Sequence, residues 1–371
     1  EGQVREVWIL DGDDTVYYSL QAALTSHAYS HRQPHAYDMA MRPREFDAKW
    51  AYQGWLGHRE EEGEHCFKLW APTAKKVELL LYQSTELDAP IWKSMPMTRG
   101  KQESSYHPEN THGVWILDFL GNLSGMAYQY RVHFEHHTQV TRDPYSIATT
   151  ADGMRTAILS RADRQFDWGT KKGADATPWR LDNPCQAVIY EMHLRDLTKS
   201  PTSGVDESLR GTYLGACQEG TVNSHGDATA FDYIRQLGVN VVQLQPISDR
   251  FKQYDEEGQV TYNWGYDVQN YSAPETSFST DPSNPEQTMK ELKTMIRAYH
   301  EAGISVVMDV VYNHIYSTEH GPFQNTVPDY YYRMEPDGRF QNGTGVGNET
   351  ASEHEMYRKY MIDSLTHGGN E

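Results

Sequence analysis

Three polar residues lie within or directly after an apolar run in the second half of the chain and could hydrogen-bond hydroxyl groups or hold a metal. The segment from Met308 to His314 reads MDVVYNH, with Asp309 inside the run and Asn313 and His314 at its end. Side chains at the carboxyl ends of parallel barrel strands face the active site, where Asp, Asn and His can bind sugar hydroxyls. Asp309 equally suits a loop anchor, and His314 a structural histidine. A metal at His314 is disfavoured, because no second His or Cys lies at ligand spacing.

A second segment, Tyr262 to Asp267, reads YNWGYD and gathers three aromatic residues around a glycine. Gly265 permits a backbone conformation that other residues avoid. It could aim Tyr266 into a cleft, where the ring would stack on a sugar and Asp267 would bind a hydroxyl. The alternative is a loop whose aromatics, Trp264 among them, fill the edge of a barrel.

Continuous apolar runs predict the strands that would carry these residues. They span Ala187 to Tyr190, Val239 to Leu244 and Ile304 to Val311, and such runs suit strands buried on both faces, as in parallel sheets. Between the last two runs we expect a helix that Asn284 caps and Gly303 ends. Strand, helix and strand in this order indicate β/α units.

The last segment of the chain predicts one more helix. It would start at Ser352, with Glu355 three residues on as a capping box, and stop at Gly368–Gly369. Residues 186–371 are therefore predicted to form the first β/α units of a TIM-type (β/α)8 barrel, with about three of the eight strands that closure needs.

Short alternating runs upstream predict a different architecture. Between residues 47 and 165 alternating apolar and polar positions are separated by Gly, Pro and polar clusters, which is typical of an antiparallel β-sandwich. Residues 1–46 are interpreted as a connector from an upstream domain, and the polar residues 166–185 as a linker. The predicted fold class is mixed: an all-β sandwich followed by the first part of a (β/α)8 barrel.

The composition and net charge limit the classes of partner that this chain is expected to bind. The net charge of −19 would repel a phosphate polyanion, so nucleic acid is excluded as an expected partner. No apolar run approaches the ~18 residues of a membrane span. The 25 Tyr and 9 Trp fit sugar binding as well as a large core. Because the chain begins at Glu1, a removed signal peptide stays open, and a secreted or cell-surface bacterial protein is slightly favoured.

Taken together, these segments resemble the alpha-amylase superfamily, glycoside hydrolase family 13. YNWGYD upstream of DVVYNH, with PETSFSTDP between them, looks like a type I pullulanase, and VIYEMHLRD resembles the first barrel strand of that group. VPDYYYR and NGTGVGNETASE resemble the loop after its third strand. FKLWAPTAKKVELLLY, with DPYSIATT later, is similar to carbohydrate-binding module family 48. The resemblance covers the chain from about residue 46 onward.

The resemblance implies roles residue by residue. Tyr266 would stack on the sugar before the scissile bond, Asp267 would contact a hydroxyl nearby, and His314 would hydrogen-bond the same sugar. Asp309, Asn313 and Trp264 would brace the site. The chain departs from the family at Val268, where pullulanases usually carry Pro, and at Thr276, where they usually carry Gly.

The largest departure concerns the catalytic carboxylates. The family's nucleophile lies on the fourth strand in a stretch like GFRFDLMG, and no such stretch occurs in these 371 residues. No Asp or Glu can be assigned as nucleophile or general acid, so the chain alone is expected to be inactive. Its expected partners are the missing C-terminal part of the barrel and an α-glucan such as pullulan, limit dextrin or glycogen. No cofactor is expected, and calcium is not assignable.

Two alternatives stay open. The first is an isoamylase or a glycogen branching enzyme, since both pair a sandwich module with this barrel. The second is a non-catalytic α-glucan-binding fragment, for which Trp70, Trp92 and Trp115 are candidate stacking platforms, although each equally suits the core.

Overall fold

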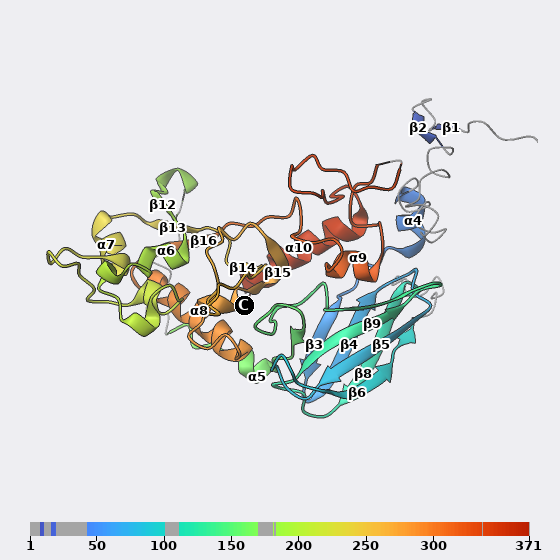
Figure 1. The fold of residues 1–371 in the computed structure, drawn as a ribbon, viewed down its shortest axis with the longest axis horizontal. Helices are drawn as coiled ribbons and strands as arrows, with labels where there is room; N and C mark the ends of the chain where they lie inside the picture. Colours follow the sequence, from blue (N-terminus) through green and yellow to red (C-terminus); the bar gives the residue numbers. More distant parts are fainter. Residues whose placement is uncertain are drawn as a thin grey trace, which may run out of the picture.

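Two parts of different architecture lie side by side in the structure, a computed structural model (Figure 1). It describes residues 8–10, 16–19, 43–100, 111–169, 181, 183–335 and 337–370. Strands dominate the first part, whereas the second alternates strands and helices. The fold class predicted from the sequence is confirmed. The proposed linker lies mostly outside the described residues.

The sandwich consists of two antiparallel sheets. One sheet has the order β3-β4-β8-β7, and the other has the order β10-β9-β5-β6 with β11 paired to β9. The strands are β3 (Gly57–Glu61), β4 (Glu64–Trp70), β5 (Lys76–Tyr82), β6 (Ile91–Pro96), β7 (Thr98–Arg99), β8 (Val114–Leu120), β9 (Ala127–His133), β10 (Thr138–Thr141) and β11 (Thr156–Ala157). The short helix α5 (Arg161–Arg164) follows, and a capping box at Ser160 caps its N-terminus.

Every second residue of the central strands faces the sandwich core. Phe67 and Leu69 of β4 lie opposite Leu79 and Leu81 of β5, and all four are buried together with Tyr130 of β9. The period of two in the sequence thus becomes one apolar face per sheet. Burial of these faces against each other holds the two sheets together.

Two of the three tryptophans considered as sugar platforms are core residues, so that part of the hypothesis is wrong. Trp70 is buried and its indole N–H donates to the Trp50 carbonyl oxygen at 2.7 Å. Trp115 is buried and donates to the Ala71 carbonyl oxygen at 3.0 Å. Trp115 packs in the sandwich core and Trp70 in an aromatic cluster with Phe46 and Tyr330, and each ring can be buried because its single polar atom finds a backbone acceptor. Trp92 is 48% exposed and stays a candidate.

The first fifty residues contain elements that the sequence patterns did not indicate. β1 (Trp8–Leu10) and β2 (Val16–Ser19) pair antiparallel, and α4 spans Pro43–Trp50. Phe46 of α4 packs against Trp70 and Tyr330, with ring centroids 6.3 Å and 5.4 Å away. This helix therefore contributes to an aromatic core that also receives residues from the second part of the chain.

The second part is built on three parallel strands in the order β12-β13-β16. They are β12 (Ile189–Met192), β13 (Val241–Leu244) and β16 (Ser305–Met308). The remaining helices and strands are α6 (Leu194–Thr198), α7 (Ala230–Leu237), β14 (Ser248–Arg250), β15 (Val268–Pro274), α8 (Pro285–Glu301), α9 (Pro322–Thr326) and α10 (Glu355–Asn370). Short 3-10 turns lie at Pro184–Gln186, Pro201–Ser203, Glu207–Leu209, Gly215–Cys217 and Thr276–Phe278. β14 and β15 form a separate antiparallel pair.

Helix α8 confirms the expectation from local signals. The Asn284 side chain accepts from the Gln287 N–H at 3.1 Å, and Pro285 occupies the first turn. Gly303 follows the helix with φ +78°, a conformation that favours glycine at this position. Tyr299 on the buried face packs against Phe231 of α7 at 4.9 Å between centroids.

The start of α10 was predicted wrongly. The helix begins at Glu355 and not at Ser352, and it continues through Gly368–Gly369 to Asn370. Its first N–H groups are capped from other parts of the chain. The Glu355 N–H donates to the Asp47 carboxylate at 3.1 Å, across 308 residues, and the Met356 N–H donates to the Tyr330 hydroxyl at 3.1 Å. A tertiary cap has replaced the local capping box.

The expectation that the parallel strands are buried on both faces largely holds for the central strand β13 but is wrong for the outer strands β12 and β16. Helices α7 and α8 cover one face, where Val242 and Leu244 pack against Ile234 and Tyr299. The other face is open, because the described sheet has three strands and does not close into a barrel. The register places Ile189 and Val307 on this face, opposite to Leu244, and both are exposed.

A histidine pair in the sandwich predicts acid sensitivity. His65 Nε2 lies 3.0 Å from the Gly121 carbonyl oxygen, which can only accept. Its Nδ1 therefore accepts from His58 Nε2 at 2.9 Å. Burial, followed by His65, lowers the pKa of His58 to about 3. His58 is thus neutral in the folded state, whereas it takes up a proton below about pH 6.5 when unfolded.

The free energy of unfolding should therefore fall as the pH drops from 6.5 towards 3, by up to about 1.4 kcal/mol per pH unit from His58. In His58→Gln an amide replaces the titrating ring, so the pH dependence should be flatter than in the wild type. Urea unfolding at pH 7, 6, 5 and 4 measures this, with His136→Gln at an exposed position as the control. Parallel pH profiles for wild type and His58→Gln would contradict the assignment.

Candidate active site

The predicted site residues gather at the carboxyl ends of the three parallel strands. Backbone hydrogen bonds continue the sheet past the strands, from Gln245 N–H to the Met192 oxygen and from Asp309 N–H to the Leu244 oxygen, both at 2.9 Å. This places His193, Gln245 and Asp309 at the carboxyl end of the parallel sheet. The loop that precedes β15 reaches the same end.

The structure brings Tyr266 and Asp309 together. The Tyr266 hydroxyl donates to Asp309 Oδ2 at 3.0 Å, although 43 residues separate the two. Burial, and then the Asp309 carboxylate, raises the pKa of Tyr266 to about 12. The phenol is therefore neutral near pH 7, and Asp309 fixes the orientation of its ring. Asp309 thus contacts Tyr266, the residue that the sequence predicts to stack on a sugar.

His314 is tied to the backbone of Tyr266. It is 8% exposed. Nε2 lies 2.9 Å from the Tyr266 carbonyl oxygen, and Nδ1 lies 2.8 Å from the Asn313 side chain. A carbonyl only accepts, so Nε2 donates to the Tyr266 carbonyl oxygen, and the Asn313 atom beside Nδ1 is the amide oxygen Oδ1, which is also an acceptor. Both nitrogens are engaged within the protein, so a sugar hydroxyl would have to replace one of these bonds.

The YNWGYD loop is shaped by local hydrogen bonds. Asn263 Oδ1 accepts from the Gly265 N–H at 2.8 Å, and Asn263 Nδ2 donates to Asp267 Oδ2 at 2.8 Å. Gly265 has φ +99°. Trp264 is 64% exposed, so most of its ring faces solvent. The Asp267 carboxylate keeps one oxygen beyond this bond that could accept from a hydroxyl.

Sequence reasoning missed two residues that support the site. His193 Nε2 donates to the Asn263 carbonyl oxygen at 3.0 Å and so holds the loop against the end of β12. Burial lowers the pKa of His193, which favours the neutral ring. Asn348 donates to the Ile315 carbonyl oxygen at 2.7 Å and accepts from its N–H at 3.0 Å. Both lie in segments that the sequence singled out, directly after the first apolar run and in NGTGVGNETASE.

A buried group of charges lies under the loop, at the β14–β15 pair. Asp249, Lys252 and Glu275 are all buried, and the Lys252 ammonium lies between the two carboxylates, 3.3 Å from Glu275. Burial alone would lower the pKa of Lys252, but Asp249 and Glu275 outweigh it and raise the pKa. Glu275 also accepts from the Arg250 N–H at 3.0 Å, so this group fixes the turn into β14.

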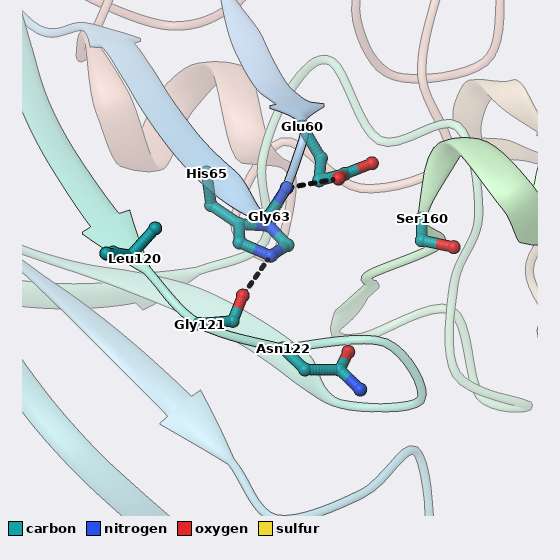
Figure 2. Close-up of a pocket in the computed structure, with 7 residues that line it drawn as sticks. All are labelled: Glu60, Gly63, His65, Leu120, Gly121, Asn122 and Ser160. Carbon is teal, nitrogen blue, oxygen red and sulfur yellow. Dashed lines mark hydrogen bonds between the residues drawn. The ribbon is translucent and has the colours of Figure 1, made fainter.

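Two hollows lie elsewhere. The first, of about 240 Å³, is at one end of the sandwich (Figure 2), where Glu60 accepts from the Gly63 N–H at 2.9 Å and His65 bonds to Gly121. The second, of about 660 Å³, lies between the sandwich and β15 with α10 and includes Tyr145 and Ser272. Neither includes the residues predicted to contact a substrate. In the described ranges no three His, Cys, Asp or Glu side chains group to hold a metal, and no helix there is long and apolar enough to cross a membrane.

Models of two known protein families match the two parts of the chain. Residues 215–360 match the alpha amylase catalytic domain, and residues 55–146 match carbohydrate-binding module 48, the isoamylase N-terminal domain. The chain pairs a family 48 carbohydrate-binding module with part of an alpha-amylase catalytic domain. The sandwich strands β3 to β10 lie in the module, whereas β13 to β16 and the loop from Tyr262 to Asp267 lie in the catalytic-domain segment.

Relatives of this alpha-amylase-family chain include debranching enzymes. The pullulanase of Bacillus subtilis is 34% identical over 328 residues, which cover 88% of this chain and 42% of the relative. Isoamylase 1 of rice is 29% identical over 84% of this chain. A solved pullulanase from Paenibacillus barengoltzii, in complex with maltohexaose and alpha-cyclodextrin, is 40% identical with a TM-score of 0.79 and matches 87% of this chain. This chain covers 48% of that one, so it spans about half the length of its relatives.

Gly265 should be intolerant of a side chain. A Cβ there would lie 2.4 Å from the Pro246 carbonyl oxygen, whereas a Cβ at Gly258, at a similar positive φ of +76°, meets nothing within 4 Å. Gly258→Ala should lower the free energy of unfolding by about 1–2 kcal/mol. Gly265→Ala should lower it by about 1–3 kcal/mol more, because the loop must move. Urea unfolding compares the two variants, and equal losses would refute the close approach at Gly265.

Proposed function

We propose that this chain is the front part of a debranching glycoside hydrolase that cleaves α-1,6-glucosidic bonds in pullulan, limit dextrins or glycogen. The observation that carries the proposal is the grouping of Tyr266, Asp309 and His314 at the strand ends of an alpha-amylase-family domain. The similarity to pullulanases that bind malto-oligosaccharides supports the substrate class.

Each residue has a role that its surroundings support. The Tyr266 ring offers a face for stacking on a glucose unit, and Asp309 keeps that ring in one orientation. Asp267 offers a carboxylate oxygen to a hydroxyl. His314 holds the Tyr266 backbone and contacts the same sugar by exchanging its Asn313 bond for a hydroxyl. These groups orient the substrate and do not themselves break the bond.

The bond-breaking chemistry needs a carboxylate pair. A retaining glycosidase uses a nucleophile and a general acid ~5–5.5 Å apart across the scissile bond. We assign neither role within these 371 residues, and we propose that both carboxylates come from further barrel strands. Those strands would also cover the open face with Ile189 and Val307. An isoamylase-type debrancher is the second candidate, favoured by the rice relative.

Substitutions in the full-length protein separate stacking from hydrogen bonding. Tyr266→Ala removes the ring, Tyr266→Phe removes only the hydroxyl, and His314→Ala removes the histidine contact. Each lost transition-state contact of about 1–3 kcal/mol should lower kcat/KM on pullulan roughly 5- to 150-fold, with Tyr266→Phe the mildest. Tyr254→Ala, at an exposed tyrosine on the neighbouring loop, is the control. Wild-type kinetics in folded Tyr266→Ala and His314→Ala would refute the site.

A complementation assay tests where the chemistry resides. Residues 1–371 alone should release no reducing ends from pullulan, because orientation without the carboxylate pair supplies neither protonation nor nucleophilic attack. Mixing them with the polypeptide that carries the remaining barrel strands should restore hydrolysis. Hydrolysis by residues 1–371 alone would show that the carboxylates lie within them, and glucan binding without hydrolysis after mixing would favour a binding module.

A further inference from the structure

One arginine of the sandwich reaches into the catalytic-domain segment. Arg142 follows β10 and is 2% exposed. Its Nε donates to Asn270 Oδ1 at 2.5 Å, its Nη2 to the Gln269 carbonyl oxygen at 3.0 Å, and its Nη1 to the His320 carbonyl oxygen at 2.9 Å. Three donors of a single guanidinium are thus used on acceptors of the other part of the molecule.

The first pair of acceptors belongs to the strand that carries the substrate loop. Gln269 and Asn270 lie in β15, which begins directly after Asp267. The Phe251 N–H donates to the Asp267 carbonyl oxygen at 2.9 Å. Any shift of β15 along its axis therefore moves Asp267, and with it Tyr266.

The third acceptor belongs to the other site-bearing segment. His320 lies six residues after His314, and between them the Tyr316 N–H donates to the Val268 carbonyl oxygen at 2.9 Å. Arg142 therefore holds both chain segments whose side chains meet in the site, one through β15 and one through the loop after β16. It sets the distance between them from the sandwich side.

The groups packed around Asn270 leave its side chain little freedom to move. Asn270 Nδ2 donates to the Gly153 carbonyl oxygen of the sandwich at 3.0 Å and to Asp249 Oδ2. Gly153 has φ +75°, and a Cβ there would lie 2.4 Å from Asp249 Oδ2. The side-chain amide of Asn270 is thus hydrogen-bonded on both sides, to Arg142 at its oxygen and to the Gly153 carbonyl and Asp249 at its nitrogen.

Replacing Arg142 would leave unpaired acceptors at this contact. Burial lowers the pKa of Arg142, while Asp249 opposes that change, and arginine stays charged in proteins at neutral pH. A buried charge requires several well-placed acceptors. Removal of the guanidinium would leave the Gln269 and His320 carbonyls without this donor, so both segments could relax.

We propose that Arg142 is a positioning residue through which the family 48 module sets the geometry of Tyr266 and His314. It touches no substrate and acts through β15 and the loop that contains His320. The proposal rests on the proposed glucan site, but its structural step can be measured without activity.

Arg99 supplies a matched control. Its guanidinium also donates to three carbonyl oxygens, those of His112, Ala74 and Pro72, at 2.8, 3.3 and 2.6 Å. All three belong to the sandwich. Arg99→Met and Arg142→Met therefore each remove three hydrogen bonds to oxygen atoms, but only the second removes bonds to the catalytic-domain segment.

The test compares Arg142→Met, Arg142→Lys and Arg99→Met in the full-length protein. Hydrogen exchange at the Phe251 and Tyr316 amides should be faster in Arg142→Met and unchanged in Arg99→Met. On pullulan, kcat/KM should fall about tenfold or more in Arg142→Met, mainly through kcat, because misplaced groups lose transition-state contacts. Arg99→Met should stay within about twofold of wild type. Arg142→Lys keeps the charge but not the three-way geometry, so it should show a smaller change of the same kind.

Equal effects of Arg142→Met and Arg99→Met on exchange and kinetics would overturn the proposal, since the arginine would then serve stability alone. If Arg142→Met does not fold, Arg142→Lys decides the question. In that variant, hydrogen exchange at the Phe251 and Tyr316 amides at the wild-type rate, or a wild-type kcat, would overturn the proposal. A wild-type protein that does not hydrolyse pullulan would reject the proposed function, whereas the exchange comparison would still decide whether Arg142 holds the two segments.

Discussion

Buried charge at the β14–β15 pair is the constraint on which the rest of the site depends. Asp249, Lys252 and Glu275 have almost no access to water, and a buried charge without partners is strongly destabilising. The three residues must therefore keep one mutual geometry, with Lys252 between the carboxylates. Arg250, whose N–H bonds to Glu275, and Asn270, whose amide bonds to Asp249, fix both strands of the pair to that geometry.

That fixed pair explains how a loop rich in glycine and aromatics can hold a defined shape. The loop leaves β14 and returns to β15, so both of its ends are anchored to the charged group. His193 and His314 then hold its middle through the carbonyl oxygens of Asn263 and Tyr266. The two histidines are buried donors to backbone, which is the structural reading left open for His314 in the sequence. Order in this loop therefore comes from neighbouring elements rather than from its own sequence.

The sequence was sufficient where the determining interactions are local, and it was insufficient where they are distant. Helix α8 was predictable because Asn284 and Gly303 lie at its own ends. The start of α10 was not, because its cap is Asp47, which lies 308 residues earlier in the chain. Position at strand ends correctly grouped Tyr266 with Asp309, but the hydrogen bond between them follows from tertiary packing. Arg142 and Lys252 gave no signal, since a polar residue in a loop is usually exposed.

Substrate orientation and bond cleavage place different geometric requirements on the groups that perform them. Stacking and hydroxyl contacts tolerate an open edge, because a ring such as Tyr266 needs only one rigid support, here Asp309. Proton transfer and nucleophilic attack require two carboxylates held at a set separation across the bond, which a three-stranded open sheet cannot enclose. Under the proposed function, the described strands therefore orient a sugar with its first contacts preformed. Under the same proposal, closure of the barrel over the face that carries Ile189 and Val307 would add the chemistry and exclude water in the same step.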